Sequence, residues 1–107
     1  MNSAVDRIKS VLETHPIVLF MKGTPQFPMC GFSSRTVEAL KACGAVFHAV
    51  NVLHDPELRA SLPRFSNWPT FPQLFINGEL IGGCDITIEL HEAGELARIV
   101  SEAQKAA

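Results

Sequence analysis

The apolar run Ile17–Met21 constrains the fold more than any other segment of the chain. All of its residues are large and hydrophobic, and no polar residue alternates with them. A strand with this pattern must be covered on both faces, as the central strand of a parallel or mixed sheet is. Pro16 precedes this short run, and residues 23–29 after it cannot be regular structure, because Pro25 and Pro28 lie so close together. We therefore expect a central strand buried on both faces.

The segments before the middle of the chain alternate between helical and strand patterns. Ser3 resembles an N-cap, and apolar residues then recur at helical spacing for about three turns. A second helix begins after Cys30 and ends near Gly44. The run Val46–Val52 predicts another apolar strand.

The second half of the chain predicts a helix, a hairpin and a helical tail. Asp55 and Pro56 form a typical helix start, although we expect Pro63 to interrupt that helix. Asn77-Gly78 joins two short apolar runs, which is a strong hairpin signal. Asp85 is the expected cap of a helix reaching about Gly94, and a last helix follows.

This order of elements predicts an α/β fold. A right-handed strand–helix–strand crossover makes two strands parallel, and the hairpin adds two antiparallel strands. The result is a small four-stranded mixed sheet flanked by helices on both faces. No repeat or linker interrupts residues 1–107, which we expect to form a single domain.

Charge, hydropathy and cysteine content exclude several classes of protein. Nine Lys+Arg against eleven Asp+Glu give a net charge of -2, which argues against a nucleic-acid partner. The longest apolar run is too short for a membrane span, and the N-terminus lacks a signal-peptide core. Three cysteines do not suit a disulfide framework. We expect a cytoplasmic protein with at least one working thiol.

Cys30 is the candidate reactive residue. It lies between a proline-containing loop and a predicted helix, where unpaired backbone N–H groups and the helix dipole favour a thiolate. Helix N-termini with basic neighbours lower a thiol pKa from about 8.5 to roughly 3.5–7.5, and Lys22 is the nearest basic residue. An inert, buried cysteine is the weaker interpretation, because the loop and Gly31 offer little to bury the sulfur.

A second cysteine is missing from the Cys30 motif. A dithiol oxidoreductase has Cys-x-x-Cys at this junction, whereas this chain has Cys30-Gly31-Phe32-Ser33. Because serine cannot resolve a mixed disulfide, Cys30 must work with glutathione, a distant cysteine or a metal centre.

The other cysteines and the histidines are less informative. Cys84 follows two glycines and precedes a helix, so the backbone there could bind an anion; a plain turn is an equally good interpretation. Cys43 shares the spacing of Val37 and Leu40 and is expected to pack in the core. The four histidines show no ligand spacing, so we expect no histidine metal site.

Four short blocks stand in order and in register: Lys22-Gly-Thr-Pro, Cys30-Gly-Phe-Ser33, Trp68-Pro-Thr-Phe-Pro-Gln73 and Gly82-Gly-Cys-Asp85. Together they resemble the monothiol glutaredoxins of the CGFS type, and the length resembles the short bacterial and organellar members. The resemblance implies a thioredoxin-like fold with glutathione held beside Cys30.

The resemblance also implies a role for each binding residue. Lys22 and Arg59 would meet the glycine carboxylate of glutathione. The backbone of Phe71, ahead of a cis Pro72, would pair with the cysteinyl part. Cys84 and Asp85 would hold the γ-glutamyl end.

The function implied by the resemblance is transfer of iron–sulfur clusters. In a homodimer, each protomer would supply Cys30, and two glutathione molecules would complete the four thiolates of a [2Fe–2S] cluster. BolA-like proteins and iron–sulfur recipient proteins are the implied partners. Trp68 and the loop 25–29 are candidate contacts, with core packing as the alternative for Trp68.

An enzymatic function is the alternative. Cys30 would attack glutathione mixed disulfides as a thiol–disulfide oxidoreductase. A variant in which Cys84 resolves Cys30 needs their Cα atoms within about 7 Å. Ser33 favours the carrier, because it leaves Cys30 without a resolving partner in its own motif.

Overall fold

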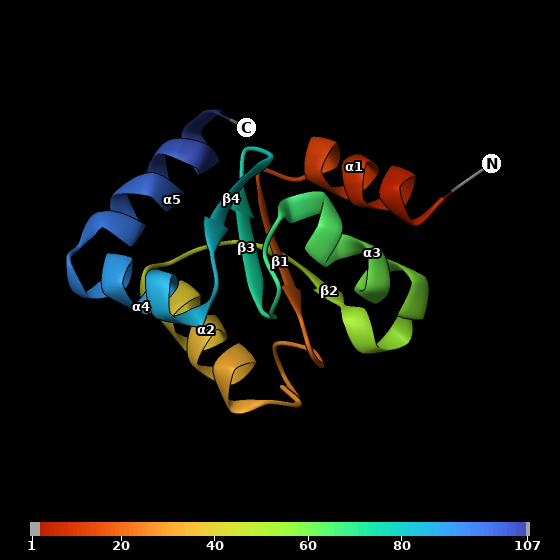
Figure 1. Cartoon of the computed structure of the whole chain (residues 1–107). Helices are drawn as coiled ribbons and strands as arrows, with labels where there is room; N and C mark the ends of the chain where they lie inside the picture. The colour runs from red at the N-terminus through yellow and green to blue at the C-terminus, as the bar shows by residue number, and fades with distance from the viewer. Residues whose placement is uncertain (1–2, 107) are drawn as a thin grey trace.

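Residues 3–106 are described by a computed structural model, in which helices cover both faces of a mixed sheet (Figure 1). No helix in this range is long and apolar enough to cross a membrane. The elements follow the predicted order: α1 (Ala4–Thr14), β1 (Ile17–Met21), α2 (Gly31–Ala42), β2 (His48–Asn51), the 3-10 helix η1 (Val52–His54), α3 (Pro56–Ser66), β3 (Gln73–Ile76), β4 (Glu79–Gly82), α4 (Cys84–Glu92) and α5 (Glu95–Ala106).

The sheet has the order β2-β1-β3-β4. Strand β1 is parallel to β2 and antiparallel to β3, and β3 and β4 form an antiparallel hairpin. Asn77 and Gly78 both have positive φ, at 52° and 79°, as a two-residue hairpin turn of type I′ requires. This topology confirms the predicted thioredoxin-like fold with a four-stranded mixed sheet.

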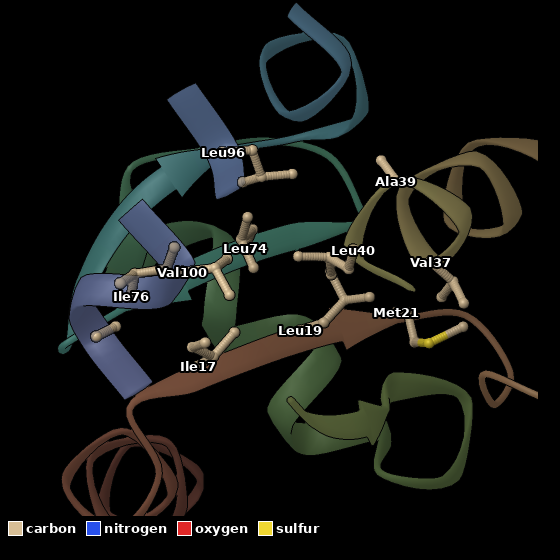
Figure 2. Close-up of a cluster of buried hydrophobic side chains, with 11 residues drawn as sticks. Ile17, Leu19, Met21, Val37, Ala39, Leu40, Leu74, Ile76, Leu96 and Val100 are labelled. Carbon is tan, nitrogen blue, oxygen red and sulfur yellow. The ribbon is translucent and has the colours of Figure 1, made fainter. Parts of the chain in front are cut away.

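Strand β1 supplies side chains to two separate hydrophobic cores. Ile17, Leu19 and Met21 pack with side chains of α2, β3 and α5 (Figure 2). Val18 and Phe20 point to the opposite face and pack with α1 and α3. Every side chain of β1 is at most 1% exposed, so the prediction of a strand buried on both faces is confirmed.

The second strand is shorter than predicted. The sequence indicated Val46–Val52, whereas β2 covers only His48–Asn51 and lies at the edge of the sheet. Val46 lies outside the ladder, exposed, and donates its N–H to Gln104 Oε1 at 2.6 Å. At the other end, Asn51 Oδ1 accepts the N–H of Leu53 and begins η1. Hydrogen bonds to side chains therefore replace strand pairing at both ends.

The prediction that Pro63 interrupts the third helix was wrong. Helix α3 continues through Pro63 to Ser66. Proline removes one intrahelical N–H donor, but Leu58 and Leu62 on the buried face hold the helix against the sheet. Packing therefore outweighs the local preference of one residue.

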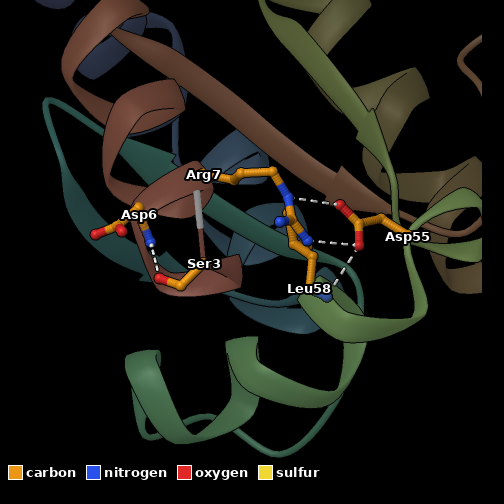
Figure 3. A network of polar contacts seen from close by, with 5 residues as sticks. All are labelled: Ser3, Asp6, Arg7, Asp55 and Leu58. Atoms are coloured by element: carbon orange, nitrogen blue, oxygen red, sulfur yellow. Dashed lines mark hydrogen bonds and ion pairs between the residues drawn. The ribbon is translucent and has the colours of Figure 1, made fainter. Parts of the chain in front are cut away.

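An ion pair joins the first helix to the start of the third (Figure 3). The Arg7 guanidinium donates to both oxygens of Asp55, at 3.1 and 2.9 Å. Asp55 also accepts the N–H of Leu58 and so caps α3, as predicted. The hydrogen bonds from Arg7, assisted by the Leu58 N–H and opposed by slight burial, lower the pKa of Asp55.

We expect Asp55→Asn to destabilise the protein at neutral pH by up to about 1 kcal/mol. Asparagine still caps the helix, so the variant isolates the charge pair. Folding lowers the pKa of Asp55, so the ionised carboxylate stabilises the fold at pH values above the unfolded pKa of about 3.9. This stabilisation is lost as the pH falls below that value and the carboxylate becomes protonated.

The measurement is the free energy of unfolding by urea denaturation at pH 7 and at pH 3. The difference between wild type and Asp55→Asn should shrink at the lower pH. Glu57→Gln is the matched control, since it removes another carboxylate from the first turn of α3, one with no ion pair within residues 3–106. A pH-independent difference would contradict this account of Asp55.

Candidate functional site

A cavity of about 740 Å³ opens beside the carboxyl end of β1. It collects side chains from the end of β1, the starts of α2 and α4, helix α3 and the loop 67–72. All five residues predicted to bind a ligand line it: Lys22, Arg59, Phe71, Cys84 and Asp85. Tertiary structure therefore assembles one site from positions scattered over more than sixty residues.

Cys30 is the N-cap of α2, at the edge of this cavity. Its Sγ accepts the backbone N–H of Ser33 at 3.3 Å, and the Cys30 thiol donates to Ser33 Oγ at 3.3 Å. Once Cys30 is a thiolate it has no proton to donate, and the Ser33 hydroxyl becomes the donor. Cys30 does not itself line the cavity, but Phe32 and Lys22 do. The sulfur is partly exposed, so a partner molecule can reach it.

The surroundings of Cys30 favour the thiolate, as predicted from the sequence. Burial of the sulfur acts to raise its pKa. Hydrogen bonds from Ser33 and from the Phe32 backbone, together with the positive charge of Lys22, outweigh that effect and hold the pKa of Cys30 below its usual value. The thiol is therefore set up as a nucleophile or a metal ligand.

Ser33 has a function in this geometry that sequence analysis missed. In the sequence, Ser33 stands only for the absence of a second thiol, yet its side chain is fully buried in the structure. Its Oγ accepts the backbone N–H of Lys22 at 3.2 Å and lies 3.3 Å from Cys30 Sγ, so its hydroxyl is placed to donate to the sulfur when Cys30 is a thiolate. Its position three residues after a helix-capping cysteine was the only signal in the sequence.

Hydrogen bonds to several residues fix the loop between β1 and Cys30. Met29 donates its N–H to Lys22 O at 2.9 Å, and Asn51 Oδ1 accepts the N–H of Gly23 at 2.9 Å. A single β-bridge joins Gly23 to Pro28. Asn51 is a second residue that the sequence did not identify, because its partner is 28 positions away.

Three exposed apolar side chains lie close to Cys30 in the sequence. Phe27, Met29 and Phe32 are 77%, 67% and 59% exposed. They come from the loop before Cys30 and from the first turn of α2.

The loop 67–72 forms one wall of the cavity. Five consecutive residues, Trp68 to Pro72, line it, and the Phe71–Pro72 peptide bond is cis, as the resemblance implied. Within residues 3–106, no hydrogen bond uses the backbone N–H or C=O of Phe71. The Phe71 backbone is therefore available to pair with a ligand.

The start of α4 forms the facing wall. The prediction that Asp85 caps this helix was wrong: the N-cap is Gly83, and Asp85 lies one residue inside the helix. A Cβ at Gly83 would lie 3.2 Å from Pro72 O and 3.3 Å from Trp68 Nε1, so glycine allows the two walls to approach. Since Asp85 does not cap, its exposed carboxylate is available to the cavity.

Cys43 and the histidines lie outside this site. Cys43 packs against the core beside α2, as predicted, and burial raises the pKa of its thiol. His15 and His48 stack with ring centroids 3.9 Å apart, so the in-plane lone pairs of their parallel rings do not converge on one ion. The described residues contain no group of three or more His, Cys, Asp or Glu that could hold a metal.

Fold and site together define a thioredoxin-like protein with one activated thiol beside a ligand cavity. The glutaredoxin family model matches residues 17–81. The chain is 49% identical over 102 residues to Glutaredoxin 4 of Escherichia coli K12, covering 95% of this chain and 89% of that protein. It is 52% identical over 98 residues to Glutaredoxin 4 of Haemophilus ducreyi, covering 92% of each. The chain therefore belongs to the glutaredoxin family, and Ser33 makes it a monothiol member.

Solved structures agree with this assignment. Reduced poplar apo GrxS14 superposes with a TM-score of 0.79 at 50% identity, covering 92% of this chain and 90% of that one. A buckwheat glutaredoxin–glutathione complex gives a TM-score of 0.83 at 27% identity, covering 94% and 90%.

We expect Ser33→Ala to slow alkylation of Cys30 by iodoacetamide at pH 6 by roughly threefold to tenfold. The variant removes one hydrogen bond to a charged sulfur, worth about 1 kcal/mol or more, and so raises the pKa of Cys30. The measurement is the pH profile of the alkylation rate, followed by mass spectrometry of the Cys30 peptide.

Thr36→Val is the matched control for this prediction. Thr36 is another fully buried hydroxyl of α2, but it donates to Phe32 O at 2.8 Å rather than to sulfur. The pH profile of Cys30 alkylation in Thr36→Val should match that of the wild type. If the profile of Ser33→Ala also matches the wild type, the Ser33 hydroxyl does not stabilise the Cys30 thiolate.

Proposed function

We propose that this protein is a glutathione-dependent carrier of [2Fe–2S] clusters. The observation that carries the proposal is the pairing of Cys30 with Ser33. One activated, accessible sulfur is present at the site, and the position of a resolving thiol is occupied by a buried hydroxyl. Such a chain can donate one thiolate to a shared cluster but cannot form a disulfide within the motif.

Glutathione is the ligand that we assign to the cavity. Lys22 and Arg59 provide cations for its glycine carboxylate, and Arg59 has no ion-pair partner within residues 3–106. The free Phe71 backbone suits the cysteinyl peptide. At the start of α4, the first-turn N–H groups suit the γ-glutamyl carboxylate, and Asp85 suits its ammonium group. The glutathione complex of the buckwheat relative supports this assignment.

The number of thiolates that a [2Fe–2S] cluster needs implies a homodimer. A [2Fe–2S] cluster takes four protein or external thiolates, and each chain offers Cys30 plus one bound glutathione. Two chains therefore complete the set as a homodimer around the cargo. Because half of the ligands are small molecules, a recipient's cysteines can replace them without any change in the carrier's fold.

Partners are expected on exposed apolar side chains. Phe27, Met29 and Phe32 are exposed and flank Cys30 in the sequence, and a second copy, a BolA-like protein or a recipient protein would bury them. We place this activity in the cytoplasm, where a reducing environment keeps Cys30 and glutathione as thiols.

Deglutathionylation is a second candidate function, which the lowered pKa of Cys30 favours. The Cys30 thiolate would attack the glutathione sulfur of a mixed disulfide and release the protein thiolate. A second glutathione thiolate would then attack that same sulfur, which frees Cys30 and forms glutathione disulfide.

Anaerobic reconstitution with ferrous iron, sulfide and glutathione tests the carrier. We expect a visible absorption band that co-elutes with a dimer on size-exclusion chromatography. Cys30→Ser and a sample without glutathione should both remain colourless and monomeric, because each lacks two of the four thiolates.

Cys43→Ser is the matched control, since it removes a cysteine that lies outside the site. It should bind the cluster like the wild type. A colourless monomer in every sample would exclude the carrier function, and turnover of a small glutathione mixed disulfide would then favour the enzyme.

A further inference from the structure

Gln73 is a fully buried polar residue behind the wall of the cavity. It begins β3 and lies opposite Phe20 of β1. Its Nε2 donates to Trp68 O at 3.0 Å and to Thr70 O at 3.2 Å. One side chain on the rigid sheet therefore holds two carbonyl groups of the loop that lines the ligand cavity.

The loop has few hydrogen bonds of its own. Pro69 and Pro72 have no backbone N–H, and the N–H groups of Asn67 and Trp68 both bond backward to Pro63 O, the latter at 3.1 Å. The carboxamide of Gln73 thus supplies the polar contacts that tie the segment between α3 and the cis Phe71–Pro72 bond to the sheet.

The orientation of the Gln73 carboxamide follows from its two partners. Both are carbonyl oxygens, which accept hydrogen bonds, so the NH₂ group must face them. Its Oε1 is buried and has no partner within residues 3–106. A buried acceptor without a partner is unfavourable, so this side chain contributes to the structure through its two donated hydrogen bonds.

These contacts determine where Phe71 lies. With the carbonyls of Trp68 and Thr70 directed at Gln73, the Phe71 backbone stays free and remains beside the cavity. We propose that Gln73 is a positioning residue, which sets the Phe71 backbone to pair with the cysteinyl peptide of glutathione. This inference rests on the proposed binding of glutathione.

Titration of ¹⁵N-labelled protein with two ligands tests the proposal. One ligand is reduced glutathione, and the other is γ-glutamylcysteine, which lacks the glycine carboxylate. Gln73→Met keeps the length of the side chain and removes the donors. We expect its dissociation constants for both ligands to rise about tenfold, because both contain the cysteinyl group that Phe71 would bind.

Arg59→Ala is the comparison variant. This variant should bind glutathione more weakly and bind γ-glutamylcysteine with unchanged affinity. The reason is that Arg59 is assigned to the glycine carboxylate, which γ-glutamylcysteine lacks. The pH profile of Cys30 alkylation should be the same in Gln73→Met and in wild type, whereas a general loosening of the site would shift it. Unchanged affinities in Gln73→Met would overturn the role of Gln73.

The wild-type protein offers a second measurement that does not depend on the variant's folding. The side-chain NH₂ resonances of Gln73 should be protected from solvent exchange and should shift when γ-glutamylcysteine binds. Rapid exchange, or no response to a bound ligand, would overturn the proposal. If wild type binds neither ligand, the proposed function fails instead, while NH₂ protection still reports whether Gln73 holds the loop.

Discussion

Burial of β1 on both faces is the constraint on which the rest of the structure depends. Alternate side chains of one short strand belong to different cores, Ile17, Leu19 and Met21 to one and Val18 and Phe20 to the other. Helices must therefore cover both faces, and each core fixes its helices relative to the same strand. Removal of one of these large side chains costs about 2–5 kcal/mol in typical cores, a large part of the stability of a small domain.

The site lies where this strand ends. Lys22 follows β1 directly, and its backbone N–H meets the buried hydroxyl of Ser33, which in turn contacts the sulfur of Cys30. The position of the cation and the position of the thiolate are thereby coupled through one oxygen atom. The rigid strand β1 keeps these positions precise. A loop alone would not hold the Lys22 N–H, the Ser33 hydroxyl and the Cys30 sulfur at hydrogen-bonding distance.

The cavity and the Cys30 thiol complement each other within one site. The cavity lining includes two cations, an unpaired backbone edge, and a helix N-terminus with a carboxylate. A small zwitterionic peptide matches that series of groups. Its thiol would lie beside Cys30, and it would supply from solution the second sulfur that Ser33 cannot provide. Under the proposed carrier function, the monothiol motif divides the cluster ligands between the protein and a diffusible peptide.

The sequence by itself determined the order of elements, the buried central strand, the hairpin turn and the activated position of Cys30, because each follows from local periodicity, backbone conformation or a helix end. Only the tertiary structure decided the functions of Ser33, Asn51 and Gln73. Ser33 and Gln73 are buried and Asn51 is half-buried. Apart from the sulfur of Cys30, their partners are backbone atoms, which carry no signature in the sequence, and some of them lie far along the chain. At β2 and at Pro63, a hydrogen bond from another element or packing outweighed a local preference, whereas α4 begins at Cys84, so that Asp85 lies inside the helix.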